Sequence, residues 1–103
     1  TFWTRAFNGA LPGPTIRARA GDELHVRFEN RLRDDDNGDD NPVNEFRGAN
    51  TTNLHTHGLH VASEAPGDDI FIEIRPRGAY DYVFDIPDFH MGGTHWYHPH
   101  HHG

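Results

Sequence analysis

Turn-forming residues divide this chain into short segments in which apolar and polar side chains alternate. Eleven glycines and seven prolines occur among the 103 residues, and the segments between them have the two-residue period of a β-strand. No segment sustains a helical period. The pattern predicts an all-β domain of about six or seven strands, with no internal repeat and no second domain within residues 1–103.

The positions of the strands follow from the alternation. Residues 15–20 and 24–29 alternate on either side of Gly21 and Asp22, which predicts a hairpin with one buried face. Further strands are expected at 51–57, 70–74, 79–86 and 94–98. The chain stops at Gly103, where a β-sandwich would normally continue, so we expect the domain to be truncated at its C-terminus.

A polar stretch covers residues 31–50. It holds five aspartates between positions 34 and 40 and has little to bury, which predicts a long acidic surface loop. A calcium site is the alternative interpretation, but the acidic residues do not have the spacing of an EF-hand loop.

Charge and cysteine content exclude several classes of protein. The chain has 9 Lys+Arg against 16 Asp+Glu, a formal charge of −7 with its ten histidines neutral. This acid excess argues against nucleic acid as a partner, and the lack of a long apolar run argues against a membrane span. The absence of cysteine excludes disulfides, zinc ribbons, iron–sulfur clusters, thiol nucleophiles and thiolate-bound copper.

Two pairs of histidines carry the strongest chemical signal. His55 and His57 are two residues apart, and on a strand both side chains leave the same face, roughly 6.6 Å apart. His98 and His100 repeat this spacing around Pro99, which cannot donate to a sheet and should end the strand. Four neutral nitrogen donors suit copper or zinc better than magnesium or calcium. The alternatives are a polar strand face, or a histidine-rich tail that chelates metal adventitiously.

The six other histidines are not expected to bind the metal directly. His60 and His95 are each three residues from the nearest histidine pair, so on a strand they would point to the face opposite that pair. This position favours a role in orienting ligands or a place on the surface. A surface position is expected for His25. The remaining three are expected near the site or its water channel: His90, His101 and His102.

Three stretches of the sequence resemble the first cupredoxin domain of the multicopper oxidases, the laccase-like enzymes. They are NGALPGPTIRARAGDELHVRFEN, NLHTHGLH and GTHWYHPHHHG, which begin at residues 8, 53 and 93. The resemblance covers nearly the whole chain except the acidic stretch. It implies a Greek-key β-sandwich whose histidines supply half the ligands of a trinuclear copper cluster, where O₂ is reduced to water.

The resemblance also implies a role for each histidine of the two pairs. His55 would bind the type 2 copper. His57 would share one type 3 copper with His98, and His100 would bind the other. Many members of the family have an acidic residue thirteen positions after the first of these histidines, here Asp68, which is proposed to feed protons to the cluster.

A surface turn at Pro66 and Gly67 is an equally good explanation of Asp68 and its neighbour Asp69.

The chain departs from the family pattern in what it lacks. The family's cluster needs eight histidines from two domains, and its type 1 copper needs a cysteine from a later domain. The chain is therefore expected to be the N-terminal domain or a fragment of a larger oxidase, inactive alone. The expected partners are further cupredoxin domains in the same chain or a neighbouring subunit, O₂ and a small reducing substrate. The resemblance also implies a periplasmic or extracellular location.

Two other functions compete with the oxidase. A copper- or zinc-binding module without turnover needs only the four histidines present. A purely structural β-sandwich leaves both pairs unexplained. A copper nitrite reductase is disfavoured, because its first domain would carry a cysteine where this chain has His100 and His101.

Overall fold

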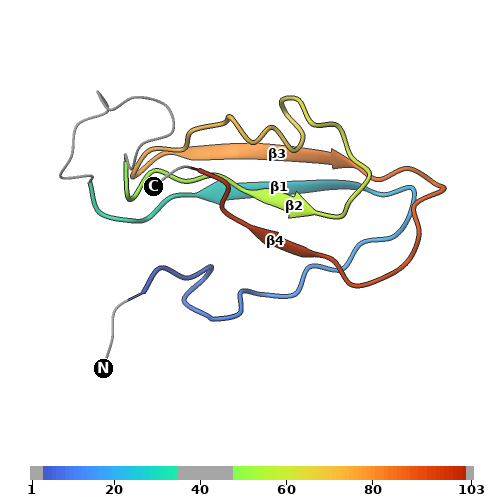
Figure 1. Ribbon diagram of the computed structural model, residues 1–103, viewed down its shortest axis with the longest axis horizontal. Helices are drawn as coiled ribbons and strands as arrows, with labels where there is room; N and C mark the ends of the chain where they lie inside the picture. The colour runs from blue at the N-terminus through green and yellow to red at the C-terminus, as the bar shows by residue number, and fades with distance from the viewer. Residues whose placement is uncertain (1–3, 35–47, 102–103) are drawn as a thin grey trace.

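The computed structural model describes residues 4–34 and 48–101, which form four strands and no helix (Figure 1). The strands are β1 (Glu23–Glu29), β2 (His55–His57), β3 (Ala79–Asp85) and β4 (Trp96–His98). The all-β prediction is confirmed. Within these residues nothing is helical, long and apolar enough to cross a membrane. Most of the acidic stretch predicted as a surface loop lies at residues 35–47, outside the described residues.

The four strands form two antiparallel sheets of two strands each. β1 pairs with β3 along its whole length, from Glu23 opposite Asp85 to Glu29 opposite Ala79. β2 pairs with β4. In Figure 1, β3 and β1 lie side by side along the long axis of the molecule. Both pairings join segments far apart in sequence, so the fold depends on long-range contacts.

The predicted hairpin between residues 15–20 and 24–29 is wrong. Residues 15–20 form no strand, and the partner of β1 is β3. Tyr82 and Phe84 of β3 lie opposite alternate residues of β1 and bury large apolar side chains, whereas Ala18 and Ala20 have too little apolar surface to stabilise a strand of their own. The turn at Gly21 was correctly located: its φ is +85°, and its N–H donates to the carbonyl of Ile86 at 2.8 Å.

The predicted strand at 70–74 is also wrong. The carbonyl of Asp69 accepts a hydrogen bond from the N–H of Ile72, and its side chain accepts one from the N–H of Phe71. These bonds bend the chain into a turn, which leaves Phe71 exposed. Only Ile74 bridges to a neighbouring segment, at Thr52.

The other predicted strands are real but shorter. The strand expected at 51–57 is limited to β2, and the strand expected at 94–98 is limited to β4. The strand expected at 79–86 is β3, which ends one residue earlier. β4 ends at the residue before Pro99, as predicted from the missing N–H of proline.

A small aromatic core holds the two sheets. Its buried members are Leu54, Ile74, Tyr82 and Phe84. The rings of Tyr82 and Phe84 stack with centroids 5.6 Å apart. The hydroxyl oxygen of Tyr82 accepts a hydrogen bond from the N–H of Leu54 at 3.0 Å. The core therefore fixes the residue that immediately precedes His55.

The N-terminal segment lies against β4. The Tyr97 hydroxyl donates to the carbonyl of Pro14 at 2.7 Å, and the rings of Phe7 and Tyr97 meet edge to face at 5.0 Å. A side chain at Gly13 would place its Cβ 2.6 Å from the Tyr97 hydroxyl oxygen. The close approach of this segment to β4 (Figure 1) thus requires glycine at position 13.

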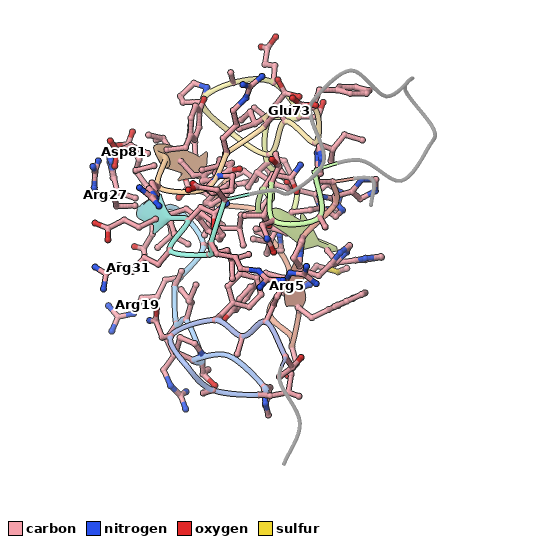
Figure 2. The ribbon with its side chains drawn as sticks, turned by 90° about the vertical axis from the view of Figure 1, so that its left-hand side faces the viewer. Arg5, Arg19, Arg27, Arg31, Glu73 and Asp81 are labelled. Atoms are coloured by element: carbon pink, nitrogen blue, oxygen red, sulfur yellow. The ribbon has the colours of Figure 1, made fainter. Side chains whose placement is uncertain are left out.

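Ion pairs cover the outer face of the β1–β3 sheet. Figure 2 shows Arg27 and Arg31 pointing to one side of the molecule, with Asp81 beside Arg27. A hydrogen-bonded pair with Asp81 raises the pKa of Arg27, and hydrogen bonds from Arg31 lower the pKa of Glu29. All four side chains are well exposed, so these pairs add little to stability.

Alkaline pH is expected to destabilise the fold through Tyr82. Burial raises the pKa of this phenol from 10.0 to about 12, against a smaller opposing effect of the Leu54 N–H. The folded state therefore holds the Tyr82 proton more tightly than the unfolded state. The stabilisation is fully present below pH about 10 and is lost as the pH rises to about 12, an effect of roughly 3 kcal/mol.

Urea unfolding at several pH values across this window would measure the effect, with Tyr82→Phe as the control because it has no phenol to ionise. An equally steep pH dependence in both proteins would contradict the assignment to Tyr82.

Candidate metal centre

The pairing of β2 with β4 brings the two histidine pairs together. His55 lies opposite His98 in the register, and their rings are 5.1 Å apart and perpendicular. Between His55 and His57, Thr56 points inward and is buried, so both imidazoles leave the other face of the strand. Nitrogen atoms of His55, His57 and His98 all lie within 4.8 Å of one another.

The closest approach is between His57 and His98. The distance from His57 Nδ1 to His98 Nε2 is 3.5 Å. A tetrahedral ion with metal–nitrogen bonds of about 2.0–2.1 Å holds its ligand nitrogens about 3.4 Å apart. The spacing of this pair therefore fits two ligands of one metal ion.

The opposite nitrogens of two of these rings are already hydrogen-bonded. His98 Nδ1 lies 2.7 Å from the carbonyl oxygen of Pro99, and His55 Nδ1 lies 2.9 Å from a carboxylate oxygen of Asp68. Both acceptors require a proton on Nδ1, which leaves the lone pair on Nε2. Such a partner on the far nitrogen is the usual arrangement of a metal-binding histidine.

Asp68 is a buried carboxylate directed at β2. Its side chain is 7% exposed, against 24% for His55. Besides the imidazole it accepts hydrogen bonds from the Thr56 N–H at 3.1 Å and the Thr56 hydroxyl at 2.6 Å. A turn is present beside it, closed by the Gly67 N–H on the Glu64 carbonyl. After that turn, the Asp68 side chain points into the interior and is not on the surface.

The fourth histidine of the two pairs lies beside the other three. The ring of His100 is 5.2 Å from that of His55 and 6.0 Å from that of His98, but it is not part of the group within 4.8 Å. Its backbone N–H donates to Asn53 Oδ1 at 2.6 Å. The position of His100 is thus fixed through its backbone.

Asn53 is the positioning residue that the sequence analysis missed. It is fully buried, and its amide also donates to the carbonyl of Ile70 at 2.8 Å. One side chain therefore ties the segment before β2 to the segment after β4. One feature of the sequence could have indicated it. Asn53 lies two residues before His55, so Asn53, His55 and His57 occupy every second position of one segment.

A comparison with known protein families identifies the class of protein. The sequence model of the family described as multicopper oxidase matches residues 2–38 and 41–103. The chain belongs to the multicopper oxidase family. The resemblance inferred from the sequence is confirmed, and the match is interrupted only within the acidic stretch.

Individual multicopper oxidases and related proteins are also similar to the chain. The multicopper oxidase MmcO of Mycobacterium tuberculosis is 34% identical over 94% of this chain, and laccase-1 of Thanatephorus cucumeris is 37% identical over 90%. Copper resistance protein A of Escherichia coli is 30% identical over 93%. The chain spans only 16%, 15% and 13% of the lengths of these relatives. No solved structure is significantly similar to it.

Three further histidines of this multicopper oxidase chain gather beside the metal centre. His60 and His95 are exposed. His90 lies between their loops, accepting the His60 N–H on Nε2 at 3.0 Å and donating from Nδ1 to the Met91 carbonyl at 2.8 Å. His95 Nδ1 lies 2.9 Å from the place where a Cβ at Gly58 would stand, and Gly58 has a φ of +94°. His90 Nε2 therefore ties the loop of His60 to the loop that carries His90 and His95, whereas the Nδ1 bond to Met91 is local.

Of the last three histidines, the two that the structure describes are outside the group of ligand nitrogens. His25 is on the surface, 2.6 Å from Glu23, as predicted. His101 is buried, with Nδ1 4.0 Å from Glu73 and with Nε2 unpartnered among the described residues. His102 lies outside the described residues.

Proposed function

We propose that this chain is the N-terminal copper-binding domain of a larger multicopper oxidase, and that it supplies half the histidine ligands of a trinuclear copper cluster at which O₂ is reduced to water. The observation that carries the proposal is the convergence of His55, His57 and His98, with nitrogens within 4.8 Å, in a chain that belongs to this family. Neutral imidazole donors favour copper, which heads the affinity order of the divalent ions for such sites.

The proposed roles of the four histidines follow the family pattern. His57 and His98 would hold one type 3 copper, which the 3.5 Å between their nitrogens supports. His55 would hold the type 2 copper and His100 the other type 3 copper. Bound copper supplies the one-electron redox chemistry. A cysteine-free chain has no thiolate for a type 1 centre.

Asp68 has two proposed roles toward this cluster. Its hydrogen bond to His55 Nδ1 orients the ring and keeps Nε2 free for the metal. As a buried carboxylate in contact with a ligand, it is also the proposed source of protons for O₂ reduction, which consumes four protons per O₂.

Half a copper cluster needs further histidine ligands and a source of electrons, and we propose the partners of the chain on this basis. The remaining histidines would come from a further cupredoxin domain, in the same polypeptide or in a neighbouring subunit. A small reducing substrate would deliver its electrons at a type 1 copper in another domain. We propose a periplasmic or extracellular location on the family pattern alone.

A copper- or zinc-binding module without turnover is the second candidate. The observation that favours it is that the three converging nitrogens come from this chain alone. Such a module would bind metal without any second domain.

Copper titration of the purified chain tests the shared part of both proposals. We expect saturable binding, a Cu(II) electron paramagnetic resonance (EPR) spectrum with nitrogen ligands, and an affinity lowered at least tenfold by either His55→Ala or His98→Ala. His25→Ala is the matched control, because this histidine is exposed and lies outside the group. Weak binding that neither change affects would overturn both proposals.

Oxygen consumption separates the two candidates. The complete gene product that contains this segment, loaded with copper and supplied with a phenol, should consume O₂ if the oxidase proposal is right. Saturable copper binding without O₂ consumption would overturn the oxidase and favour the binding module.

A further inference from the structure

One indole lies against two of the proposed ligands at once. The ring of Trp96 stacks on that of His57, with centroids 4.8 Å apart and planes 17° apart. It also stacks on the ring of His98, at 4.2 Å and 24°. These are the two histidines whose nitrogens are 3.5 Å apart. Trp96 therefore contacts both members of the closest nitrogen pair.

The register of the sheet accounts for this contact. Trp96 of β4 is directly opposite His57 of β2, and His98 is two residues further along β4, on the same face. Trp96 can therefore contact His57 as its directly opposed partner across the sheet and His98 as the next residue on the same face of its own strand. The stacking is thus a consequence of the β2–β4 pairing.

His57 has the greater need of such a support. His98 is held at Nδ1 by the Pro99 carbonyl. His57 is exposed, and among the described residues its only hydrogen-bond contact is with His98 itself. The terminal torsion of a histidine side chain is broad, so a ring without a fixed partner would rotate. The flat face of Trp96, stacked on the ring, restricts that rotation.

Trp96 is not needed to build the core. It is 57% exposed and does not belong to the buried cluster or to the partly buried residues packed against it. Because the core does not depend on it, an effect of Trp96 on the metal centre can be separated from an effect on folding.

We propose that Trp96 is a positioning residue of the metal centre. Its indole holds the imidazole planes of His57 and His98 so that their nitrogens converge on one metal ion, and it covers that side of the site from water. This inference rests on the proposed metal site. It assigns to the exposed residue of β4 a role that the strand pattern alone does not reveal.

The first test compares Trp96→Leu with Trp96→Phe. The leucine variant loses the flat ring, and we expect its Cu(II) affinity to fall about tenfold, the lower end of the effect of losing an orienting partner. Its EPR hyperfine splitting should change as well, which a purely structural role would not cause. The phenylalanine variant keeps an aromatic face and should recover most of the affinity and the original spectrum.

Phe89→Leu is the matched control, because Phe89 is also an exposed aromatic residue and contacts His60, which is not a proposed ligand. It should bind copper as the unchanged chain does.

A second measurement leaves Trp96 in place. The chain has two tryptophans, so in a Trp3→Phe background all indole fluorescence comes from Trp96. Stoichiometric Cu(II) should quench this emission strongly, and His98→Ala should shift the quenching to higher copper concentration.

The outcomes separate this inference from the proposed function. Saturable copper binding that depends on His98, with unchanged affinity and spectrum in Trp96→Leu or with no quenching, would overturn the role of Trp96 alone. Copper binding that is indifferent to His98 would overturn the metal site and the role of Trp96 together.

Discussion

Replacing Asp68 with asparagine is expected to lower the copper affinity of the chain 10- to 100-fold and to destabilise the fold by about 1–3 kcal/mol. The carboxylate accepts hydrogen bonds from the His55 ring, the Thr56 N–H and the Thr56 hydroxyl. An amide has one acceptor oxygen in place of two, and its NH₂ would face a donor. One buried donor would lose its partner, and the His55 ring would lose its fixed orientation.

Asp69→Asn is the matched control for this prediction. Asp69 is the adjacent carboxylate, but within residues 4–34 and 48–101 its side chain accepts only the N–H of Phe71, which an asparagine oxygen also accepts. Copper titration and urea unfolding on both variants would measure the two effects. Equal affinities for Asp68→Asn and Asp69→Asn would show that the buried carboxylate does not orient the ligand.

The strands that the sequence predicted correctly are those in which alternation and long-range packing agree. In β3, the aromatic residues Tyr82 and Phe84 alternate with outward residues, so the pattern and the core select the same face. Residues 15–20 alternate equally well, but Ala18 and Ala20 have little surface to bury, and this segment forms no strand beside β1. Alternation shows that a segment can form a strand, and the size of its apolar face decides whether it does.

The histidine pairs were found in the sequence because their spacing matches the strand period. What the spacing could not show is how each ring is held. Asp68 follows a proline and a glycine, which is equally typical of a surface turn, and only the fold directs it inward to His55. The sequence indicates no role for Trp96, because its contact with His57 depends on the pairing of strands about 40 residues apart.

Replacing Asn53 with alanine is expected to have the largest effect on stability. Asn53 is fully buried, and its side chain satisfies both the N–H of His100 and the carbonyl of Ile70. Removing the amide leaves two polar groups without their partner, at about 1–3 kcal/mol for each that stays buried. For a domain of this size, whose stability is on the order of 5–10 kcal/mol, that is a large fraction of the total.

The same substitution should also separate two parts of the metal centre. Asn53 holds the backbone of His100, whereas His57 and His98 are placed by the β2–β4 register. Copper bound between His57 and His98 should therefore be largely retained in Asn53→Ala, while any binding that depends on His100 is weakened. Ser63→Ala, at an exposed position, controls for a general effect of substitution. If Asn53→Ala unfolded in urea at the same midpoint as this control, the tie between the two ligand segments would contribute nothing to stability, and His100 would have to be held in another way.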